Sequence, residues 1–114
     1  MYTIIYFETR RKEVPVLNFL DKLNAKAQTK ILKQISLLSQ EGQKLRRPYA
    51  DYLRSGIYEL RIKFSPNEYR VLYFFVVKEW IVLTHGFIKK SGKVPKAEIE
   101  RAITYKLEFG RRFK

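Results

Sequence analysis

Three cationic side chains can gather on one face of a predicted β-sheet, where together they would bind a phosphate group. Side chains alternate between the two faces of a strand, so Glu59, Arg61 and Lys63 share a face of the strand predicted at residues 57–64. We expect Lys63 to lie directly opposite Arg70 on the next strand. Like charges in that position destabilise a sheet by up to about 1 kcal/mol. Either an anion binds between the two side chains, or both extend into water.

One histidine completes this candidate site. If Val77 pairs with Trp80 in the following hairpin, Leu72 faces both Arg61 and His85. Neighbouring cations would lower the pKa of His85 and keep its imidazole neutral at pH 7. A neutral imidazole suits a general base or a donor to a phosphate oxygen. The alternative is a structural hydrogen bond at the end of a strand.

The charge of the chain predicts a polyanionic partner. The 114 residues include 24 Lys and Arg against 11 Asp and Glu, which gives a net charge of +13. A domain so charged repels itself unless it meets an anion, and nucleic acid is our first expectation, with an anionic membrane surface as the second. Four lysines without an acidic residue among them extend the positive charge beyond His85; they are Lys89, Lys90, Lys93 and Lys96.

Other residue types exclude several kinds of site. The chain has no cysteine and one histidine, so disulfides, thiolate metal sites, cysteine nucleophiles and histidine clusters are excluded. The longest wholly apolar run, residues 71–77, is far shorter than the roughly 18–20 residues of a membrane span. No signal peptide is visible, because Arg10, Arg11 and Lys12 interrupt the first apolar residues. We therefore expect a cytoplasmic protein with one domain over residues 1–114.

Periodicity predicts the elements that position the candidate site. We expect a strand at residues 2–8, a helix from Pro15 to about Leu23, and a second helix that ends at Gly42, with a long loop over residues 43–56. The second helix has an apolar stripe of Ala27, Ile31, Ile35 and Leu38, and its outer face carries Lys26, Lys30, Lys33 and Gln34. Three antiparallel strands follow at about 57–64, 69–77 and 80–87, joined by a four-residue turn at 65–68 and a two-residue turn at 78–79. Pro95 opens a last helix, in which Ile99, Ala102, Ile103 and Leu107 share an apolar face, and Gly110 ends it. This order predicts an α+β domain.

The two faces of the predicted sheet differ in composition. Alternation places Leu72, Phe74, Ile81 and Leu83 on the face of the cations, grading away from them. The other face is the better candidate to pack the helices, and it carries Tyr58, Leu60, Ile62, Val71, Tyr73, Phe75, Trp80 and Val82. The assignment depends on register, because a slip of one residue moves every side chain to the opposite face.

Several of these segments together resemble a known toxin family. The runs Tyr58-Glu59-Leu60-Arg61-Ile62-Lys63-Phe64 and Tyr69-Arg70-Val71-Leu72-Tyr73 resemble the core of RelE-superfamily toxins. The run Leu83-Thr84-His85-Gly86-Phe87-Ile88-Lys89-Lys90, then Val94-Pro95 and Glu98-Ile99-Glu100-Arg101-Ala102, is similar to HigB toxins of the phage-derived Gp49-like family, in the RelE/ParE superfamily. The resemblance covers about residues 57–103. It implies a RelE-like fold, with an N-terminal strand and helix hairpin, a three-stranded antiparallel meander and a C-terminal helix.

The resemblance also implies an activity and partners. It implies the toxin of a type II toxin–antitoxin system, an endoribonuclease (mRNA interferase) that cuts messenger RNA on the ribosome and so inhibits translation. A cognate helix-turn-helix antitoxin of the HigA-like kind is the implied partner, and we expect no cofactor, no metal and no membrane. By position, Arg61 and Lys63 match residues that bind the scissile phosphate, and Arg70 matches the arginine that stabilises the transition state. The substrate-binding candidates are Glu59, Lys89, Lys90 and Lys93.

Cleavage without a metal would proceed by attack of the RNA 2′-hydroxyl on the adjacent phosphate. The general base would be His85, Glu59 or a lysine, and Glu59 can instead hold Arg61 in place. The acid would be Lys63, Lys89 or Lys90. Two other functions fit the same residues: a non-catalytic RNA- or DNA-binding module whose tyrosines and phenylalanines stack on bases, and a basic protein that only holds an acidic partner.

Overall fold

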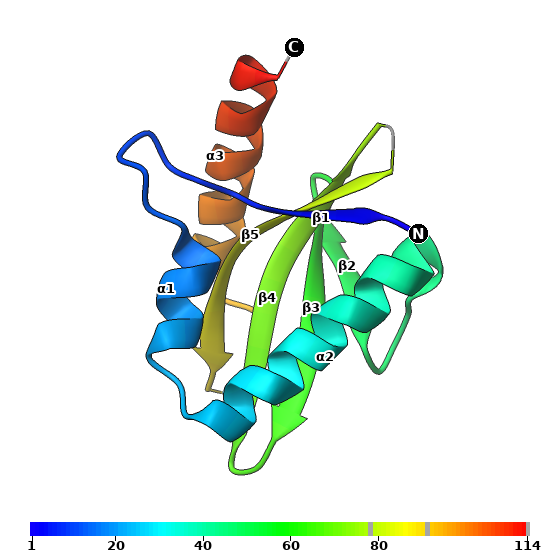
Figure 1. The fold of residues 1–114 in the computed structure, drawn as a ribbon, viewed down its shortest axis with the longest axis vertical. Helices are drawn as coiled ribbons and strands as arrows, with labels where there is room; N and C mark the ends of the chain where they lie inside the picture. The colour runs from blue at the N-terminus through cyan, green and yellow to red at the C-terminus, as the bar shows by residue number, and fades with distance from the viewer. Residues whose placement is uncertain (78, 91, 114) are drawn as a thin grey trace.

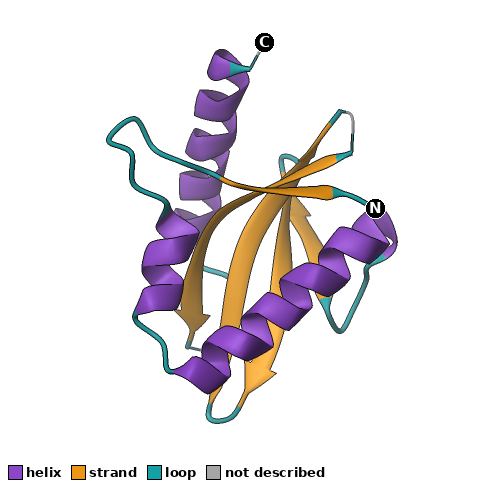
Figure 2. Cartoon of the chain, in the orientation of Figure 1, coloured by secondary structure: helices purple, strands orange, loops and turns teal. Residues whose placement is uncertain are grey.

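Five strands form one mixed sheet that has helices on both faces (Figure 1, Figure 2). The structure is a computed structural model, which describes residues 1–77, 79–90 and 92–113. The predicted α+β class is confirmed. In chain order the elements are β1 (Thr3–Tyr6), α1 (Pro15–Asp21), α2 (Ala25–Glu41), the short 3₁₀ helix η1 (Gly42–Lys44), β2 (Ala50–Arg54), β3 (Ile57–Phe64), β4 (Asn67–Val76), β5 (Trp80–Lys89) and α3 (Lys96–Arg112).

The sheet is larger than the predicted three-stranded meander. Its strand order is β1-β5-β4-β3-β2, so β2 to β5 form a four-stranded antiparallel meander. β1 adds to the outer side of β5 in parallel, from Thr3 opposite Trp80 to Tyr6 opposite Leu83. β2 lies in the segment that we expected to be a loop. It is a five-residue edge strand that carries Asp51 and Arg54, and charged residues on edge strands weaken the hydrophobic alternation from which strands are recognised.

α1 and α2 cover one face of the sheet (Figure 1). The side-chain oxygen of Asn24 accepts a hydrogen bond from the Ala27 amide at 2.9 Å and caps the start of α2. The predicted apolar stripe is confirmed, since Ala27, Ile31, Ile35 and Leu38 are all buried. Gly42 ends α2 with a φ of +54°, as predicted, and a side chain there would collide with the Tyr2 ring.

α3 lies on the opposite face and buries Ile99, Ala102 and Phe109. It packs against Leu72 and Phe74 of β4 and Val82 of β5. The helix continues through Gly110, and Leu107 is 58% exposed, so both of those sequence-based assignments are wrong. Figure 1 shows α3 behind part of the sheet, on the face opposite α1 and α2. No helix in the described part of the chain is long and apolar enough to cross a membrane.

A β-bulge in β5 explains why the prediction of the two faces is partly wrong. Leu72 pairs with His85, as expected, and Tyr73 pairs with Leu83, so Thr84 is the extra residue. The other two parts of that prediction are wrong, because Trp80 pairs with Val76 and not Val77, and Leu72 lies opposite Glu59 and not Arg61. Beyond the bulge every side chain of β5 changes face. Ile81 and Leu83 therefore pack toward α1 and α2, whereas Val82 and Trp80 pack toward α3. Local alternation contains no signal for an inserted residue of this kind.

Candidate functional site

Charged side chains occupy the half of the sheet face that α3 leaves open. Lys63 of β3 lies opposite Glu68 of β4, which in turn lies opposite Lys89 of β5. In the adjacent row Arg61 lies opposite Arg70. The predicted pairing of Lys63 with Arg70 is wrong by two residues, because the hairpin loop holds only Ser65 and Pro66. A shift of two residues keeps each side chain on its predicted face.

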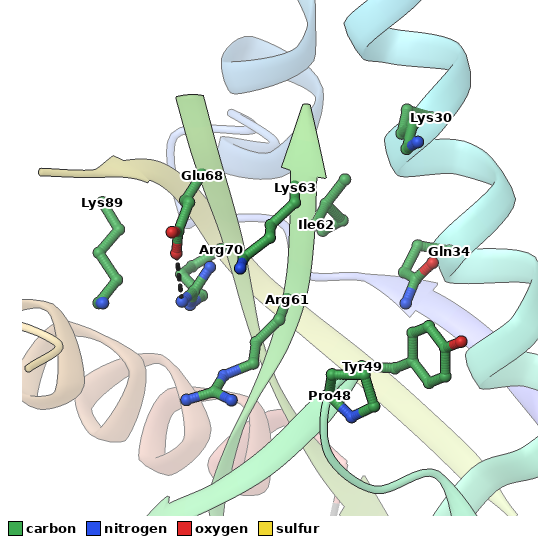
Figure 3. A pocket seen from close by; sticks show the side chains of 10 residues that line it. All are labelled: Lys30, Gln34, Pro48, Tyr49, Arg61, Ile62, Lys63, Glu68, Arg70 and Lys89. Carbon is green, nitrogen blue, oxygen red and sulfur yellow. Dashed lines mark hydrogen bonds and ion pairs between the residues drawn. The ribbon is translucent and has the colours of Figure 1, made fainter. Parts of the chain in front are cut away.

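Two carboxylates join the arginines into one network. Glu59 accepts a hydrogen bond from Arg70 Nε at 2.8 Å and another from Arg61 Nε at 3.3 Å. Arg70 Nη2 also donates to Glu68 Oε1 at 3.0 Å, the contact drawn in Figure 3. The side chains of Arg70 and Glu59 are each only 4% exposed, whereas those of Arg61 and Glu68 are 30% and 40% exposed. The anion between the paired arginines is thus the protein's own Glu59.

A hollow of about 460 Å³ opens in front of this network, astride the outer edge of β3 (Figure 3). The pairing of β2 with β3 reaches only from Ile57 to Leu60, so the rest of β3 borders the hollow. We call it the edge hollow; its lining residues are Lys30, Gln34, Pro48, Tyr49, Arg61, Ile62, Lys63, Glu68, Arg70 and Lys89. One lining carboxylate faces several lysines and arginines, so the edge hollow is an anion-binding environment.

Glu68 stays ionised in this environment. The hydrogen bond from Arg70 lowers the pKa of Glu68 against the opposing effect of burial, and the charges of Arg70, Lys63 and Lys89 lower it further. Glu68 therefore occupies a position in which a negatively charged group is stabilised. The side chain of Glu68 is 40% exposed, so this position is open to solvent, whereas the guanidinium of Arg70 beneath it is only 4% exposed.

His85 lies outside the edge hollow, in a separate polar cluster that we call the α3 junction, formed by Thr84, His85 and Glu98. Its side chain is 1% exposed, Nε2 lies 2.9 Å from Glu98 Oε1 and Nδ1 lies 3.1 Å from Thr84 Oγ1. The pKa of His85 is lowered to about 4; burial is the largest cause, the charge of Arg101 acts in the same direction, and the hydrogen bond and charge of Glu98 oppose both. This direction favours the neutral imidazole that we predicted, with burial as the main cause in place of neighbouring cations. With both ring nitrogens engaged, His85 ties the first turn of α3 to β5.

The other predicted residues are divided between two neighbouring hollows. Lys89 lines the edge hollow and also an adjoining hollow of about 350 Å³, which Arg61, Glu59 and Lys93 line as well. Lys90 is exposed and lines neither. The structure thus brings Arg61, Lys63, Arg70 and Lys89 together and places Glu59 beneath them.

Sequence reasoning missed the four other polar residues that line the edge hollow: Lys30, Gln34, Tyr49 and Glu68. We assigned Glu68 to a four-residue turn at residues 65–68. The loop of the structure is two residues shorter, so Glu68 lies in β4. Tyr49 precedes β2, the strand that sequence reasoning missed. Lys30 and Gln34 were assigned to the outer face of α2, and only the tertiary structure brings that helix beside the β3 edge.

The chemistry available to the site is the binding and stabilisation of anions. Within the described ranges, no group of three or more histidines, cysteines, aspartates and glutamates lies close enough together to hold a metal ion. Glu59 and Glu68, the carboxylates nearest the hollow, each accept hydrogen bonds from arginine. Guanidinium and ammonium groups around one hollow match the oxygen atoms of a phosphate.

The comparison with known families gives one match. Residues 18–106 match the family described as phage derived protein Gp49-like (DUF891). The matched range runs from α1 into α3 and contains the edge hollow, the adjoining hollow and the α3 junction. No curated protein matches the chain.

Proposed function

Because the chain belongs to the phage-derived Gp49-like family, which is associated with RelE-like toxins, we propose that it is a toxin of the HigB kind that cuts messenger RNA on the ribosome. The observation that carries the proposal is the edge hollow, where Arg61, Lys63, Arg70 and Lys89 meet on one sheet face. An anion of polynucleotide size is the ligand such a surface fits, and the net charge of +13 favours the same ligand.

The proposed reaction needs cations more than any other group. The 2′-hydroxyl oxygen of RNA attacks the adjacent phosphorus, so an O2′–P bond forms and the P–O5′ bond breaks. The hydroxyl passes its proton to water, the leaving 5′-oxygen takes one from a side chain of the hollow, and the products are a 2′,3′-cyclic phosphate and a 5′-hydroxyl end. Negative charge accumulates on the phosphate in the transition state, and each well-placed donor is worth roughly 10²- to 10³-fold in rate.

The geometry suggests different roles for the two arginines. Arg61 is 30% exposed, and its Nε contact with Glu59 leaves the tip of the guanidinium toward the edge hollow, as Figure 3 shows. We assign it to the non-bridging oxygens of the phosphate. The three contacts of Arg70, with Glu59, Glu68 and the Tyr69 carbonyl, use three of the five N–H groups of an arginine. Arg70 thus fixes Glu59 and adds positive charge from below the hollow.

The proton donor of the reaction is a side chain that is exposed in the edge hollow. His85 is buried at the α3 junction and both Glu59 oxygens hold arginines, so neither is free to act as the general base. Lys63 is exposed on β3, and we assign it as the acid that protonates the leaving oxygen. Correct alignment of the 2′-hydroxyl by the ribosome would supply much of the remaining acceleration, up to about 7–11 kcal/mol in favourable cases.

The antitoxin is the second proposed partner. A helix-turn-helix protein of the HigA-like kind with an acidic or mixed-charge segment would neutralise part of the positive surface. Electrostatic steering between the two would be screened within about 8–10 Å at physiological salt. Association should therefore slow as salt is added.

Growth of bacteria that express the chain alone tests the proposal. The wild-type protein should arrest growth and deplete full-length messages, and Lys63→Ala should relieve both effects without loss of folded protein, because Lys63 is exposed. Lys12→Ala is the matched control: Lys12 is an exposed lysine in the β1–α1 loop and should leave the arrest unchanged. Normal growth with abundant folded wild-type protein would contradict the toxin assignment, and arrest by Lys63→Ala with intact messages would favour a non-catalytic binder.

A further inference from the structure

A basic surface on α2 continues the edge hollow past the edge of β3. A neighbouring hollow of about 350 Å³ is lined by Ala25, Lys26, Thr29, Lys30, Lys33 and Phe64. Lys30 lines both hollows, so the two are contiguous on the surface. We call the set Lys26, Lys30, Lys33, Gln34 and Phe64 the α2 track. The roles proposed above for Arg61, Lys63, Arg70 and Lys89 do not use it.

Phe64 gives the track an aromatic surface among cations. It is the last residue of β3, it is partly exposed, and its ring lies with its centroid 6.0 Å from Lys30 Nζ. Its inner side packs against the core beneath α1 and α2, which holds the ring in place. An aromatic ring held beside several lysines is the arrangement on which single-stranded nucleic acids stack their bases while cations bind the phosphates.

Gln34 supplies a second, independent indication of a ligand. Its amide nitrogen is buried but has no hydrogen-bond partner among the described residues. Figure 3 shows the side chain reaching from α2 toward the edge hollow, and Gln34 is one of the residues that line the hollow. An unsatisfied buried donor costs free energy unless a ligand or solvent acceptor reaches it. Phosphate oxygens and the carbonyl groups of bases are suitable acceptors.

We propose that the α2 track binds the part of a single RNA strand that continues beyond the phosphate held in the edge hollow. The lysines would contact successive phosphates, Phe64 would stack on one base, and Gln34 would donate a hydrogen bond at the junction of the two hollows. An acidic peptide would also contact the lysines, but the partly exposed ring of Phe64 and the continuity at Lys30 with the proposed phosphate site favour RNA. This inference rests on the proposed function, because it extends the same substrate.

Binding of RNA strands of two lengths tests the track separately from cleavage. Fluorescence anisotropy would follow 2′-O-methyl oligouridylates of about 4 and about 12 nucleotides, lengths that span the usual site sizes for single strands. The methyl group blocks the attacking hydroxyl, so binding is measured whether or not the protein cuts RNA. Lys26→Ala/Lys30→Ala/Lys33→Ala is the test variant. Arg10→Ala/Arg11→Ala/Lys12→Ala removes the same charge from the exposed β1–α1 loop, which Figure 1 shows at the opposite end of the molecule from the start of α2.

The test variant should bind the long strand about 10- to 100-fold more weakly than the control, while the two bind the short strand within a few-fold of each other. Its slope of log affinity against log salt should fall by about 2, since each lost phosphate contact on a single strand contributes about 0.7. Phe64→Leu, which retains an apolar side chain in the core, should weaken long-strand binding roughly tenfold. Equal decreases in long-strand affinity in the test and control variants would show that RNA binding depends only on total charge, which would contradict the proposed role of the α2 track.

Two further outcomes would also overturn the inference. The test variant would keep full affinity for the long strand if RNA does not follow α2. If the α2 track binds a protein instead of RNA, the test variant would bind the antitoxin more weakly and would bind both RNA strands as the control does. By contrast, failure of the proposed function would appear as wild-type protein that leaves ribosome-bound message intact, whatever the strands show.

Discussion

The arginines of the edge hollow and His85 of the α3 junction lie on the same face of the sheet, yet the two sites have opposite properties. In the hollow, Arg61, Lys63 and Lys89 reach an open surface. At the junction, Thr84 and His85 are buried and hydrogen-bonded beneath the start of α3. The difference lies in what covers each row of the sheet. Polar side chains that a helix covers hold the structure together, and those left uncovered remain available to a ligand.

Glu59 connects the two regions. It is buried like the residues of the junction, but its two oxygens hold Arg70 and Arg61 of the hollow. In the sheet Glu59 pairs with Leu72, which pairs with His85. The rigid row that anchors α3 thus also fixes the arginines that face the ligand. The comparison predicts that buried members of this system determine stability and exposed members determine binding and rate.

The largest effect on stability is expected at Arg70. Arg70→Ala leaves Glu59 with one partner, Arg61, in a site where its side chain is 4% exposed. Breaking a buried ion pair from one side costs about 3–5 kcal/mol. Lys63→Ala, on the exposed row, should change the free energy of unfolding by about 0.5 kcal/mol or less. Urea denaturation of both variants measures the two free energies of unfolding. Equal decreases in the two variants would contradict the division into buried residues that stabilise the fold and exposed residues that bind the ligand.

A smaller effect, dependent on pH, is expected at His85. Because the pKa of His85 is lowered to about 4 in the fold, the unfolded chain, with an ordinary value of 6.5, binds a proton more readily. Above pH 6.5 His85 is neutral in both the folded and the unfolded chain, so its titration does not lower the free energy of unfolding. As pH falls from 6.5 toward 4, the unfolded chain binds the proton first, and the free energy of unfolding decreases by up to about 3 kcal/mol. His85→Gln keeps a donor toward Glu98 but does not titrate. The difference in unfolding free energy between the two proteins should shrink as pH falls through that window, and a constant difference would contradict the neutral imidazole.

The smallest effect is expected at Glu68. Glu68→Gln removes the negative charge that stands beside Arg70, Lys63 and Lys89, so the edge hollow should bind pyrophosphate a few-fold more tightly. The free energy of unfolding should change little, because the Glu68 carboxylate is solvent-accessible and its ion pair is screened by water. Calorimetric titration measures the affinity, with Glu13→Gln in the exposed β1–α1 loop as the matched control. Equal affinities in the two variants would place the anion elsewhere.

Strong local patterns predicted much of the fold. The strand at residues 57–64 is confirmed at both ends because apolar and charged residues alternate along it, and the apolar stripe of α2 is confirmed for the same kind of reason. β2 was missed because an edge strand with charged residues carries little alternation. The parallel pairing of β1 with β5 joins segments far apart in sequence, and no local pattern encodes it.

The candidate site was predicted in composition but not in geometry. Alternation correctly placed Glu59, Arg61 and Lys63 on one face, and it failed for β5 because the bulge at Thr84 reverses the faces. The pairing of Arg70 with two carboxylates required the true register of the hairpin. The burial of His85 required α3, whose position over the sheet depends on tertiary packing.

The central claim is that the edge hollow cuts RNA with cations and a lysine proton donor, and the ends of cleaved message test it most directly. Ribosomes that translate a defined message would be mixed with wild-type protein, Lys63→Ala or Lys63→Arg, and the new 5′ ends tested for labelling by kinase without phosphatase. We predict 5′-hydroxyl ends with the wild-type protein and a loss of roughly 10²- to 10³-fold in rate with Lys63→Ala. Lys63→Arg should restore little, because arginine keeps its proton. Ends that carry a 5′-phosphate, or full activity in Lys63→Ala, would contradict the account.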